Sequence, residues 1–140
     1  MQDRLHSSFW ALRIGFGLTA FLAGLDKFFN LLTNWEGYLS PLVVGLSPFS
    51  STAVVQIAGV IEMIAGIAIL AGLTRLGGYV VAAWLTLIAV NLVLSGRFFD
   101  VAVRDLVMAI GAFTLARLSE VREEAVALRP ARRRESAIAA

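Results

Sequence analysis

The sequence predicts an all-α integral membrane protein, an up-down-up-down bundle of four helices. First, the 140 residues are 59% hydrophobic and have a mean hydropathy of +0.80. Second, 16% of the residues are charged, whereas soluble domains carry about a quarter. Third, four apolar segments approach the roughly 20 residues with which a helix crosses a bilayer. The length indicates one domain. A soluble protein of this size has too little interior to bury so many apolar side chains.

The apolar segments differ in character. The first, residues 9–32, is predicted to be a mature helix, because no small-residue cleavage site follows it. The second and third, residues 52–73 and 76–94, are the clearest spans, and the third carries no formal charge. The fourth covers residues 101–117, but only 106–116 are strictly apolar. Its first turn is therefore expected at the interface or buried in protein.

The connections predict how the helices are arranged. Residues 33–51 form a long loop with two prolines and two aromatic interface anchors, Trp35 and Tyr38. Its apolar centre is expected to dip into the membrane or lie on it, and the loop is a candidate cap for an outer pocket. Residues 72–78 and 95–100 are tight turns, which make consecutive helices antiparallel neighbours.

Positive charge predicts the orientation and the domain limits. Arg4, Arg75 and the C-terminal arginines would share one side of the membrane, opposite a smaller basic group, so both termini are placed in the cytoplasm. Residues 1–117 are the predicted membrane domain and residues 118–140 a basic cytoplasmic tail. Six arginines and four glutamates lie in residues 117–140. This stretch lacks interleaved aromatics, which favours contact with anionic lipid and disfavours nucleic acid.

The composition excludes several kinds of site. The chain has no cysteine and one histidine, His6, which lies near the N-terminus. Disulfides, thiolate metal sites and thiol-relay mechanisms are therefore excluded, as is a histidine-rich metal centre. No covalently bound cofactor is expected.

Small residues predict where helices approach closely. Gly15, Gly17 and Gly24 lie on the first helix, and Gly59 and Gly66 lie on the second. Lipid provides no hydrophobic drive between helices, so close backbone packing has to hold them together. These glycines are interpreted as packing residues.

Seven polar side chains lie inside the apolar segments or at their ends. With both termini in the cytoplasm, six of them fall in the outer half of the bilayer, and Glu62 lies near its midplane. Charges at this depth are costly and normally pair with one another or mark a ligand path. Glu62 is the candidate catalytic residue, as a proton-exchanging carboxyl. The candidate ligand-binding residues are Asp26, Lys27, Gln56, Asn91, Arg104 and Asp105.

Two adjacent charge pairs suggest a latch between the first and fourth helices. Adjacent residues of a helix point about 100° apart, so Asp26 cannot pair well with Lys27, nor Arg104 with Asp105. The first and fourth helices are neighbours in a simple four-helix bundle. The hypothesis is a crossed latch in which Asp26 pairs with Arg104 and Lys27 pairs with Asp105.

Glu62 has two interpretations. It shares a helix face with Gly59 and Gly66, so its carboxyl points at a packed neighbour or a cavity. It is either protonated or paired across the bundle with Lys27 or Arg104. In the structural interpretation it completes an ionic cluster that holds the helices together. In the functional interpretation it marks a ligand or proton site.

The remaining polar and aromatic residues are interpreted as structural. Interhelical hydrogen bonds explain Gln56 and Asn91. Arg13 is expected to extend its side chain to the lipid headgroups. The aromatic residues interpreted as packing or interface residues are Trp10, Tyr79 and Trp84.

Three stretches together resemble the DoxX family of small bacterial membrane proteins. They are LRIGFGLTAFLAGLDKF (residues 12–28), AGVIEMIAGIAILAGLTRLGGY (58–79) and VRDLVMAIGAFTLA (103–116). The motif residues are Arg13, Gly24, Lys27, Glu62 and Gly66, and the likeness covers about residues 9–117. The resemblance implies four helices in the bacterial inner membrane. Some relatives are associated with thiosulfate:quinone oxidoreductase and others with oxidative-stress complexes.

The sequence and the resemblance leave three functions open. The first is a subunit or scaffold of a redox-linked membrane complex. The second is a quinone-binding oxidoreductase subunit, in which Lys27 or Arg104 orients a quinone carbonyl or an anionic donor such as a sulfur oxyanion. The third is an oligomeric transporter of a small solute. Whether the chain is an enzyme stays open. The expected partners are the lipid bilayer, a membrane or redox protein and further copies of this chain.

Overall fold

The computed structural model describes residues 2–139, and all its regular elements are helical. Side chains are described for all of these except residues 2–4, 129, 131–137 and 139. The elements are α1 (Gln2–Asp26), a 3-10 turn η1 (Trp35–Tyr38), α2 (Pro41–Leu46), α3 (Ser51–Ala71), α4 (Thr74–Leu94) and α5 (Phe99–Ala139). The all-α prediction is confirmed over the described residues.

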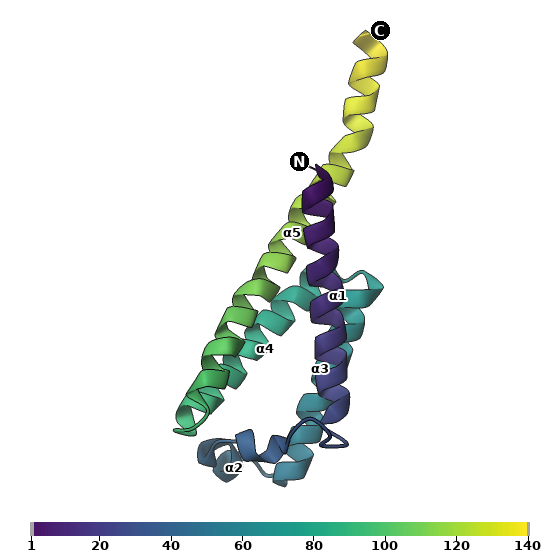
Figure 1. The fold of residues 1–140 in the computed structure, drawn as a ribbon. Helices are drawn as coiled ribbons and strands as arrows, with labels where there is room; N and C mark the ends of the chain where they lie inside the picture. Colours follow the sequence, from purple (N-terminus) through teal and green to yellow (C-terminus); the bar gives the residue numbers. More distant parts are fainter. Residues whose placement is uncertain (1, 140) are drawn as a thin grey trace.

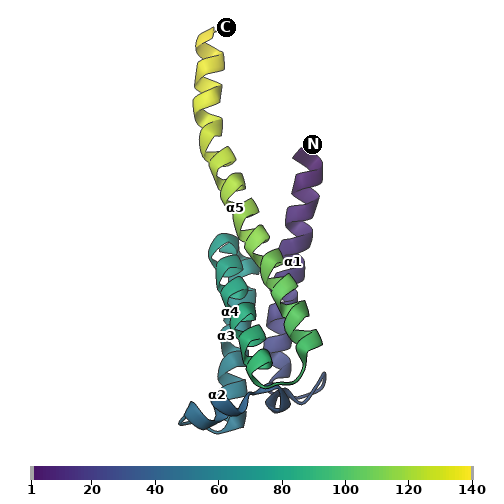
Figure 2. The same cartoon turned by 90° about the vertical axis from the view of Figure 1, so that its left-hand side faces the viewer.

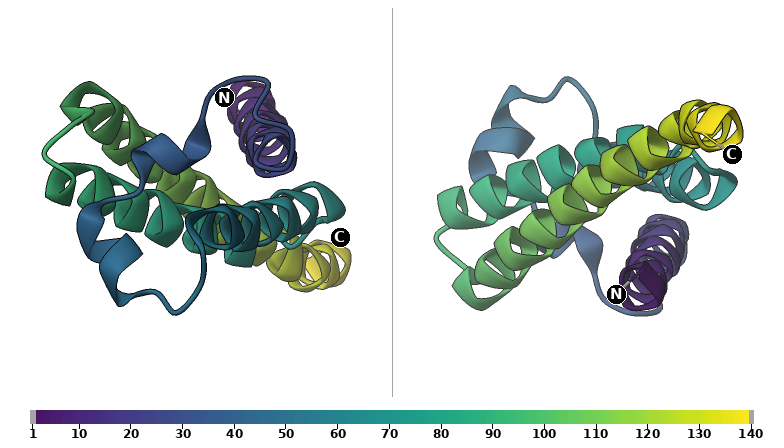
Figure 3. Two further views of the ribbon diagram at one scale, coloured as in Figure 1. Left: turned by 90° about the horizontal axis from the view of Figure 1, so that it is seen from below. Right: turned by 90° about the horizontal axis from the view of Figure 1, so that it is seen from above.

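The four long helices form two pairs. Helix α1 packs along α3 and helix α4 packs along α5, and contacts between α3 and α4 join the pairs (Figure 1). Both termini lie at one end of the molecule, and η1 and α2 lie at the other (Figures 1 and 2). Seen along the helices, α1 stands apart from the α4–α5 pair (Figure 3). The two ends are called the terminal end and the loop end below.

Glycines hold α1 against α3, as the sequence predicts. A Cβ atom at Gly24 would lie 2.5 Å from the Gly59 carbonyl oxygen, and one at Gly66 would lie 2.6 Å from the Gly17 carbonyl oxygen. Only glycine permits this approach of two helix backbones. Gly15 is the exception, because a Cβ added there would meet nothing within 4 Å. Its interpretation as a packing residue is wrong.

A small apolar core lies at the level of the α3–α4 turn. Ile69, Ala112 and Leu115 are fully buried there, next to Phe9 and Val81. These residues come from all four long helices, so this cluster joins the two pairs on the side of the terminal end. A second cluster, around Leu92 and Ala102, joins α4 to α5 near the loop end.

Three helices are long and apolar enough to cross a membrane. They are residues Leu5–Asp26, Ser51–Ala71 and Thr74–Leu94, and α5 does not meet the same criterion within the described residues. Large apolar side chains are exposed along all four long helices, among them Leu22, Ile64, Leu87 and Ile110. A monomeric soluble protein rarely exposes so much apolar surface. A lipid environment accounts for it.

Two of the predicted helix ends are wrong. Helix α1 ends at Asp26 and not at residue 32, because Asp26 accepts hydrogen bonds from the backbone of the following loop and the chain reverses through Asn30 (φ +51°). Helix α5 does not stop at residue 117, since charged residues of good helix propensity follow. Residues 118–139 therefore continue α5, which extends past the first residues of α1 at the terminal end (Figure 2). The tail arginines 129 and 132–134 lie outside the residues whose side chains are described.

Arg13 binds the backbone of α3, and its predicted contact with lipid headgroups stays a prediction. Its Nε donates to the Ile69 carbonyl at 3.0 Å, and its Nη2 donates to the Leu70 carbonyl at 2.7 Å. The last carbonyls of a helix have no partner within the helix. Arg13 thus satisfies the C-terminal end of α3 and fixes the height of α1 beside it.

Candidate functional site

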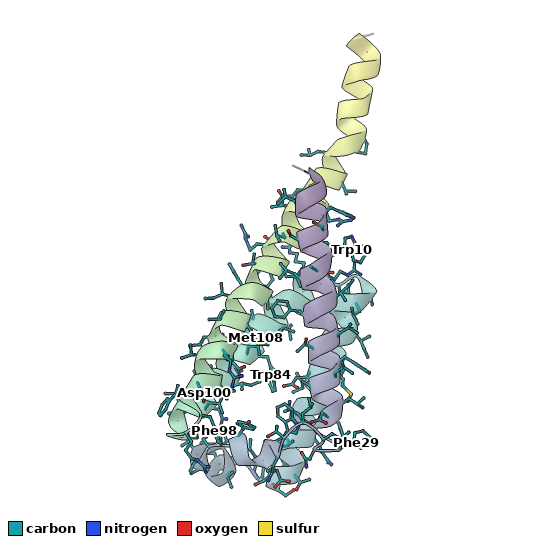
Figure 4. All side chains as sticks on the ribbon, viewed as in Figure 1. Trp10, Phe29, Trp84, Phe98, Asp100 and Met108 are labelled. Carbon is teal, nitrogen blue, oxygen red and sulfur yellow. The ribbon has the colours of Figure 1, made fainter. Side chains whose placement is uncertain are left out.

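A cavity of about 440 Å³ lies between the two helix pairs. Its walls come from α1, α3, α4 and α5, and one end is closed by residues of the 33–39 segment. Most of the lining is apolar, including Phe16, Val81 and Met108. Figure 4 shows Trp84 and Met108 between the α4–α5 pair and α1. We call this space the central cavity.

A buried ion pair forms part of the cavity wall. The Lys27 Nζ lies 2.6 Å from Glu62 Oε2, and both side chains are only 9% exposed. Lys27 follows the last residue of α1, and Glu62 lies one helical turn past Gly59 on α3. The close glycine contact between Gly24 and Gly59 therefore brings the two charged groups together. The predicted pairing of Glu62 with Lys27 is confirmed, and the alternative with Arg104 is wrong.

Two tryptophans complete this cluster. The indole N–H of Trp84 donates to Glu62 Oε1 at 2.9 Å, so both carboxylate oxygens of Glu62 have partners. The Lys27 Nζ lies 3.7 Å from the centroid of the Trp35 ring, a cation–π contact. Trp84 lies on α4, so its hydrogen bond ties the α1–α3 pair to the α4–α5 pair. We call Lys27, Glu62, Trp35 and Trp84 the ionic cluster.

The segment after α1 closes the loop end of the cavity. On the α1 side, Asp26 accepts a hydrogen bond from the Trp35 indole at 2.8 Å. On the α4 side, the Asn91 amide donates to the Tyr38 carbonyl at 2.7 Å and accepts from the Ser40 N–H at 2.9 Å.

Two further contacts tie the same segment to α3 and to the α4–α5 turn. The Thr52 hydroxyl of α3 donates to Glu36 at 2.7 Å. The Tyr38 ring lies 4.6 Å from the Phe98 ring, which belongs to the α4–α5 turn. Residues 33–40 thus form a floor that is bound to each neighbouring part of the structure.

The cavity lies where α1 and α5 diverge. These two helices contact each other near Phe16 and Gly111, where a Cβ on Gly111 would come within 2.9 Å of the Phe16 ring. They meet again toward the terminal end, where Arg122 lies over the Phe9 ring. Toward the loop end they separate (Figures 1 and 3). The side chains that face this gap include Lys27, directly after α1, and Arg104 and Asp105 from α5.

The crossed latch between α1 and α5 is wrong. Lys27 pairs with Glu62, and Asp26 accepts hydrogen bonds from the loop. Arg104 pairs along its own helix with Asp100, at 3.2 Å and with the two side chains 69% and 76% exposed. The physical reason is the pairing of helices. Helix α1 packs on α3 and not on α5 at this level, so the cavity separates the two halves of the proposed latch.

Five of the seven predicted site residues line the central cavity: Lys27, Glu62, Asn91, Arg104 and Asp105. Asp26 and Gln56 do not line the cavity. Asp26 accepts hydrogen bonds from residues 31, 32 and 35. Gln56 forms no hydrogen bond with any described residue, so its predicted interhelical bond is wrong. Asn91 bonds the backbone of Tyr38, the last residue of the short 3-10 helix η1, and of Ser40, so its predicted interhelical bond reaches η1 and not one of the other long helices.

Sequence reasoning missed the polar roles of the aromatic residues. Trp84 and Trp35 donate hydrogen bonds to carboxylates. Tyr79, at the terminal end, donates to Glu120 at 2.8 Å. A buried indole or phenol usually has a polar partner, and that rule is the one signal that could have found these contacts.

The charges around the cavity balance. Lys27 and Arg104 contribute two positive groups, and Glu62 and Asp105 contribute two negative groups. Lys27 has three N–H donors, of which one is used by Glu62. Among the residues whose side chains are described, no group of three histidine, cysteine, aspartate or glutamate residues could hold a metal ion. The cavity therefore suits a neutral, mainly apolar molecule with a hydrogen-bond acceptor.

Neither a protein-family model, nor a curated protein, nor a solved structure matches this chain. The resemblance to the DoxX family consequently stays a hypothesis that depends on the residues quoted for it. The proposed function therefore depends on the central cavity and its ionic cluster.

Proposed function

We propose that this chain is a DoxX-like, four-helix integral membrane protein that binds a neutral, lipid-soluble ring compound in its central cavity. A quinone is the expected ligand, and the protein would act as the quinone-binding subunit of a redox-linked membrane complex. The observation that carries the proposal is the buried Lys27–Glu62 pair on the wall of a cavity of about 440 Å³. Small-molecule sites typically have volumes of about 300–1,000 Å³, apolar walls and few polar groups.

The chain's residues have distinct roles in this proposal. A spare N–H of Lys27 would donate to a carbonyl oxygen of the ligand, and Glu62 would hold Lys27 in place. Trp84 fixes the other oxygen of Glu62 and presents its ring to the cavity. A quinone would supply the electron-accepting chemistry, while the protein binds it, orients it and keeps water from it.

The balance of charge favours a neutral ligand over the anionic donor that the sequence left open. An anion would meet Glu62 and Asp105 as well as the two basic groups. It would also have to compete with Glu62 for Lys27 at 2.6 Å. A neutral carbonyl avoids both costs, since it accepts a hydrogen bond without displacing the carboxylate.

The proposed setting is the bacterial inner membrane, with α1, α3, α4 and the first part of α5 as spans. Both termini lie at one end of the molecule, as four crossings require (Figure 1). By the excess of arginine at the terminal end we place that end in the cytoplasm. The gap between α1 and α5 would then admit a ligand sideways from the lipid.

The test is mass spectrometry of small molecules extracted from protein purified in native lipid. Three chains are compared: the wild type, Trp84→Phe, and the double variant Lys27→Met/Glu62→Gln. Replacing both members of a buried pair with neutral groups of similar size often leaves stability intact. We expect a quinone in the wild type and its loss from the folded double variant. Equal retention by all three chains would overturn the proposal.

A non-catalytic scaffold is the second candidate, and one observation favours it. Each charged group of the ionic cluster already has a protein partner: Lys27 bonds Glu62, and Glu62 also accepts from Trp84. The cluster could therefore fix the two helix pairs without binding any ligand. In that case the double variant would fold, assemble with its partner protein and contain the same small molecules as the wild type.

A further inference from the structure

A second hollow lies at the terminal end, away from the central cavity. It has a volume of about 390 Å³ and is bounded by α1, the α3–α4 turn and α5. Its polar lining includes Arg13, Thr74, Ser119 and Arg122, and its apolar lining includes Phe9 and Val126. The hollow exists because α3 and α4 turn at residues 72–73, while α1 and α5 continue past them (Figure 2).

Two arginines from different helices flank one tryptophan beside this hollow. The Arg13 guanidinium carbon lies 4.7 Å from the centroid of the Trp10 ring, and the Arg122 guanidinium carbon lies 5.9 Å from it. Arg122 also lies 4.7 Å from the Phe9 ring centroid. The aromatic rings thus gather two positive groups on one side of the hollow.

Neither arginine has a carboxylate partner among the side chains that the structure describes. Arg75, Arg104 and Arg117 each pair with an acidic group, and so does Lys27. Arg13 uses two N–H groups on the α3 carbonyls, and the Arg122 Nη1 lies 3.4 Å from His6 Nδ1.

Glu123, the one acid in the lining, is 3.8 Å from Arg75 outside the hollow. The lining therefore has two arginines against one glutamate, so the hollow keeps a net positive charge. An anion with several acceptor oxygens could bind both arginines.

The position of the hollow suits the headgroup of a lipid. It lies just beyond the α3–α4 turn, which marks the end of two candidate spans. In a membrane this is the level of the lipid phosphates, and basic pockets between spanning helices at this level suit anionic headgroups. Arginine matches phosphate oxygens with paired N–H donors. We propose that the hollow between Arg13 and Arg122 binds a phosphate ester, most directly the headgroup of an anionic phospholipid from the leaflet at the terminal end.

The test uses delipidated full-length protein in a neutral detergent and isothermal titration calorimetry. The titrants are dihexanoyl phosphatidylglycerol, dihexanoyl phosphatidylcholine and glycerol 1-phosphate. We expect phosphatidylglycerol to bind more tightly than phosphatidylcholine. The anionic lipid should bind about tenfold more weakly to Arg122→Gln, the effect of losing one charge-assisted hydrogen bond. Tight binding of glycerol 1-phosphate would assign the site to a soluble phosphate ester, and weak binding would assign it to lipid.

Matched variants separate this site from the rest of the protein. Arg97→Gln removes another arginine without a carboxylate partner among the described side chains, at the loop end, and should bind the anionic lipid as the wild type does. Lys27→Met/Glu62→Gln should also bind it normally, so failure at the central cavity and failure here are distinguishable. If Arg122→Gln does not fold, Arg122→Lys keeps the charge and should lose part of the affinity. Equal affinity of the wild type and Arg122→Gln, or an equal loss in Arg97→Gln, would overturn the proposal.

Discussion

Charged side chains are arranged differently at the two ends of the molecule. At the loop end, Lys27 and Glu62 are buried, paired at 2.6 Å and held by a tryptophan. At the terminal end, Arg122 is exposed and, among the side chains described, faces no carboxylate; its neighbours are aromatic rings and His6. A buried charge must have a fixed partner, because an isolated one is too costly. An exposed charge needs none and is free to bind a ligand, so the first arrangement predicts large effects on stability and the second predicts effects on binding.

The most damaging change should be the loss of one member of the buried pair. Lys27→Met leaves the Glu62 carboxylate without its countercharge, and we expect a loss of about 3–5 kcal/mol in the free energy of unfolding. Denaturation in mixed detergent, followed by circular dichroism, measures this. The double variant Lys27→Met/Glu62→Gln should recover most of the loss. A single variant as stable as the wild type would show that the pair is not buried.

The next largest effect should come from the glycine contact that sets the pair in place. Gly24→Ala introduces a Cβ that meets the Gly59 carbonyl oxygen, and we expect a loss of about 1–3 kcal/mol. Gly15→Ala is the matched control on the same helix, where the added Cβ meets nothing. The control should be neutral or slightly more stable, because alanine favours the helix by about 1 kcal/mol over glycine. Equal melting temperatures for the two variants would contradict the α1–α3 register.

A more local effect is expected at the floor of the central cavity. Asn91→Ala removes two hydrogen bonds to the backbone of residues 38 and 40 and should cost about 1–3 kcal/mol. Amide hydrogen exchange should rise in residues 33–46 and stay unchanged in α3. Gln56→Ala is the control, because Gln56 bonds no described residue. Unchanged exchange of the loop in Asn91→Ala would mean that the floor is held in another way.

The smallest effect should be at the exposed pair of α5. Asp100→Asn removes the partner of Arg104, but surface pairs contribute only about 0–1 kcal/mol. The melting temperature should therefore barely change. A large loss would instead indicate that Arg104 and Asp100 are buried, for instance by a second copy of the chain.

The sequence predicts the architecture well because hydropathy and turn chemistry act locally. The limits of α3 and α4 lie within two residues of the predicted segments, and the glycines of the α1–α3 contact were identified as packing residues. The limits of α1 and α5 were missed for reasons that depend on tertiary contacts and on charge. The loop backbone returns to Asp26 and ends α1, while the charged residues after 117 continue α5 without apolar packing.

The sequence predicts most residues of the candidate site, but not which charged residues pair with each other. The predicted depth of each residue in the membrane was enough to group Lys27, Glu62, Arg104 and Asp105. All four line one cavity. Their partners depend on which helices pack together, and the sequence does not show that α1 pairs with α3 along its length. The sequence predicts that a buried Trp84 indole N–H has a polar partner, but not that this partner is Glu62, since the contact crosses between the two helix pairs.

The most direct test of the central claim is to fill the central cavity while leaving its ion pair intact. Ala23 lines the cavity, one helical turn from Lys27 on α1, and Ala23→Phe would place a ring in the space. The measurement is calorimetric binding of a short-chain ubiquinone to the wild type and to this variant in the same detergent. We predict saturable binding by the wild type and none by a variant that melts at a similar temperature. Equal binding by both would contradict the assignment of the cavity as the ligand site.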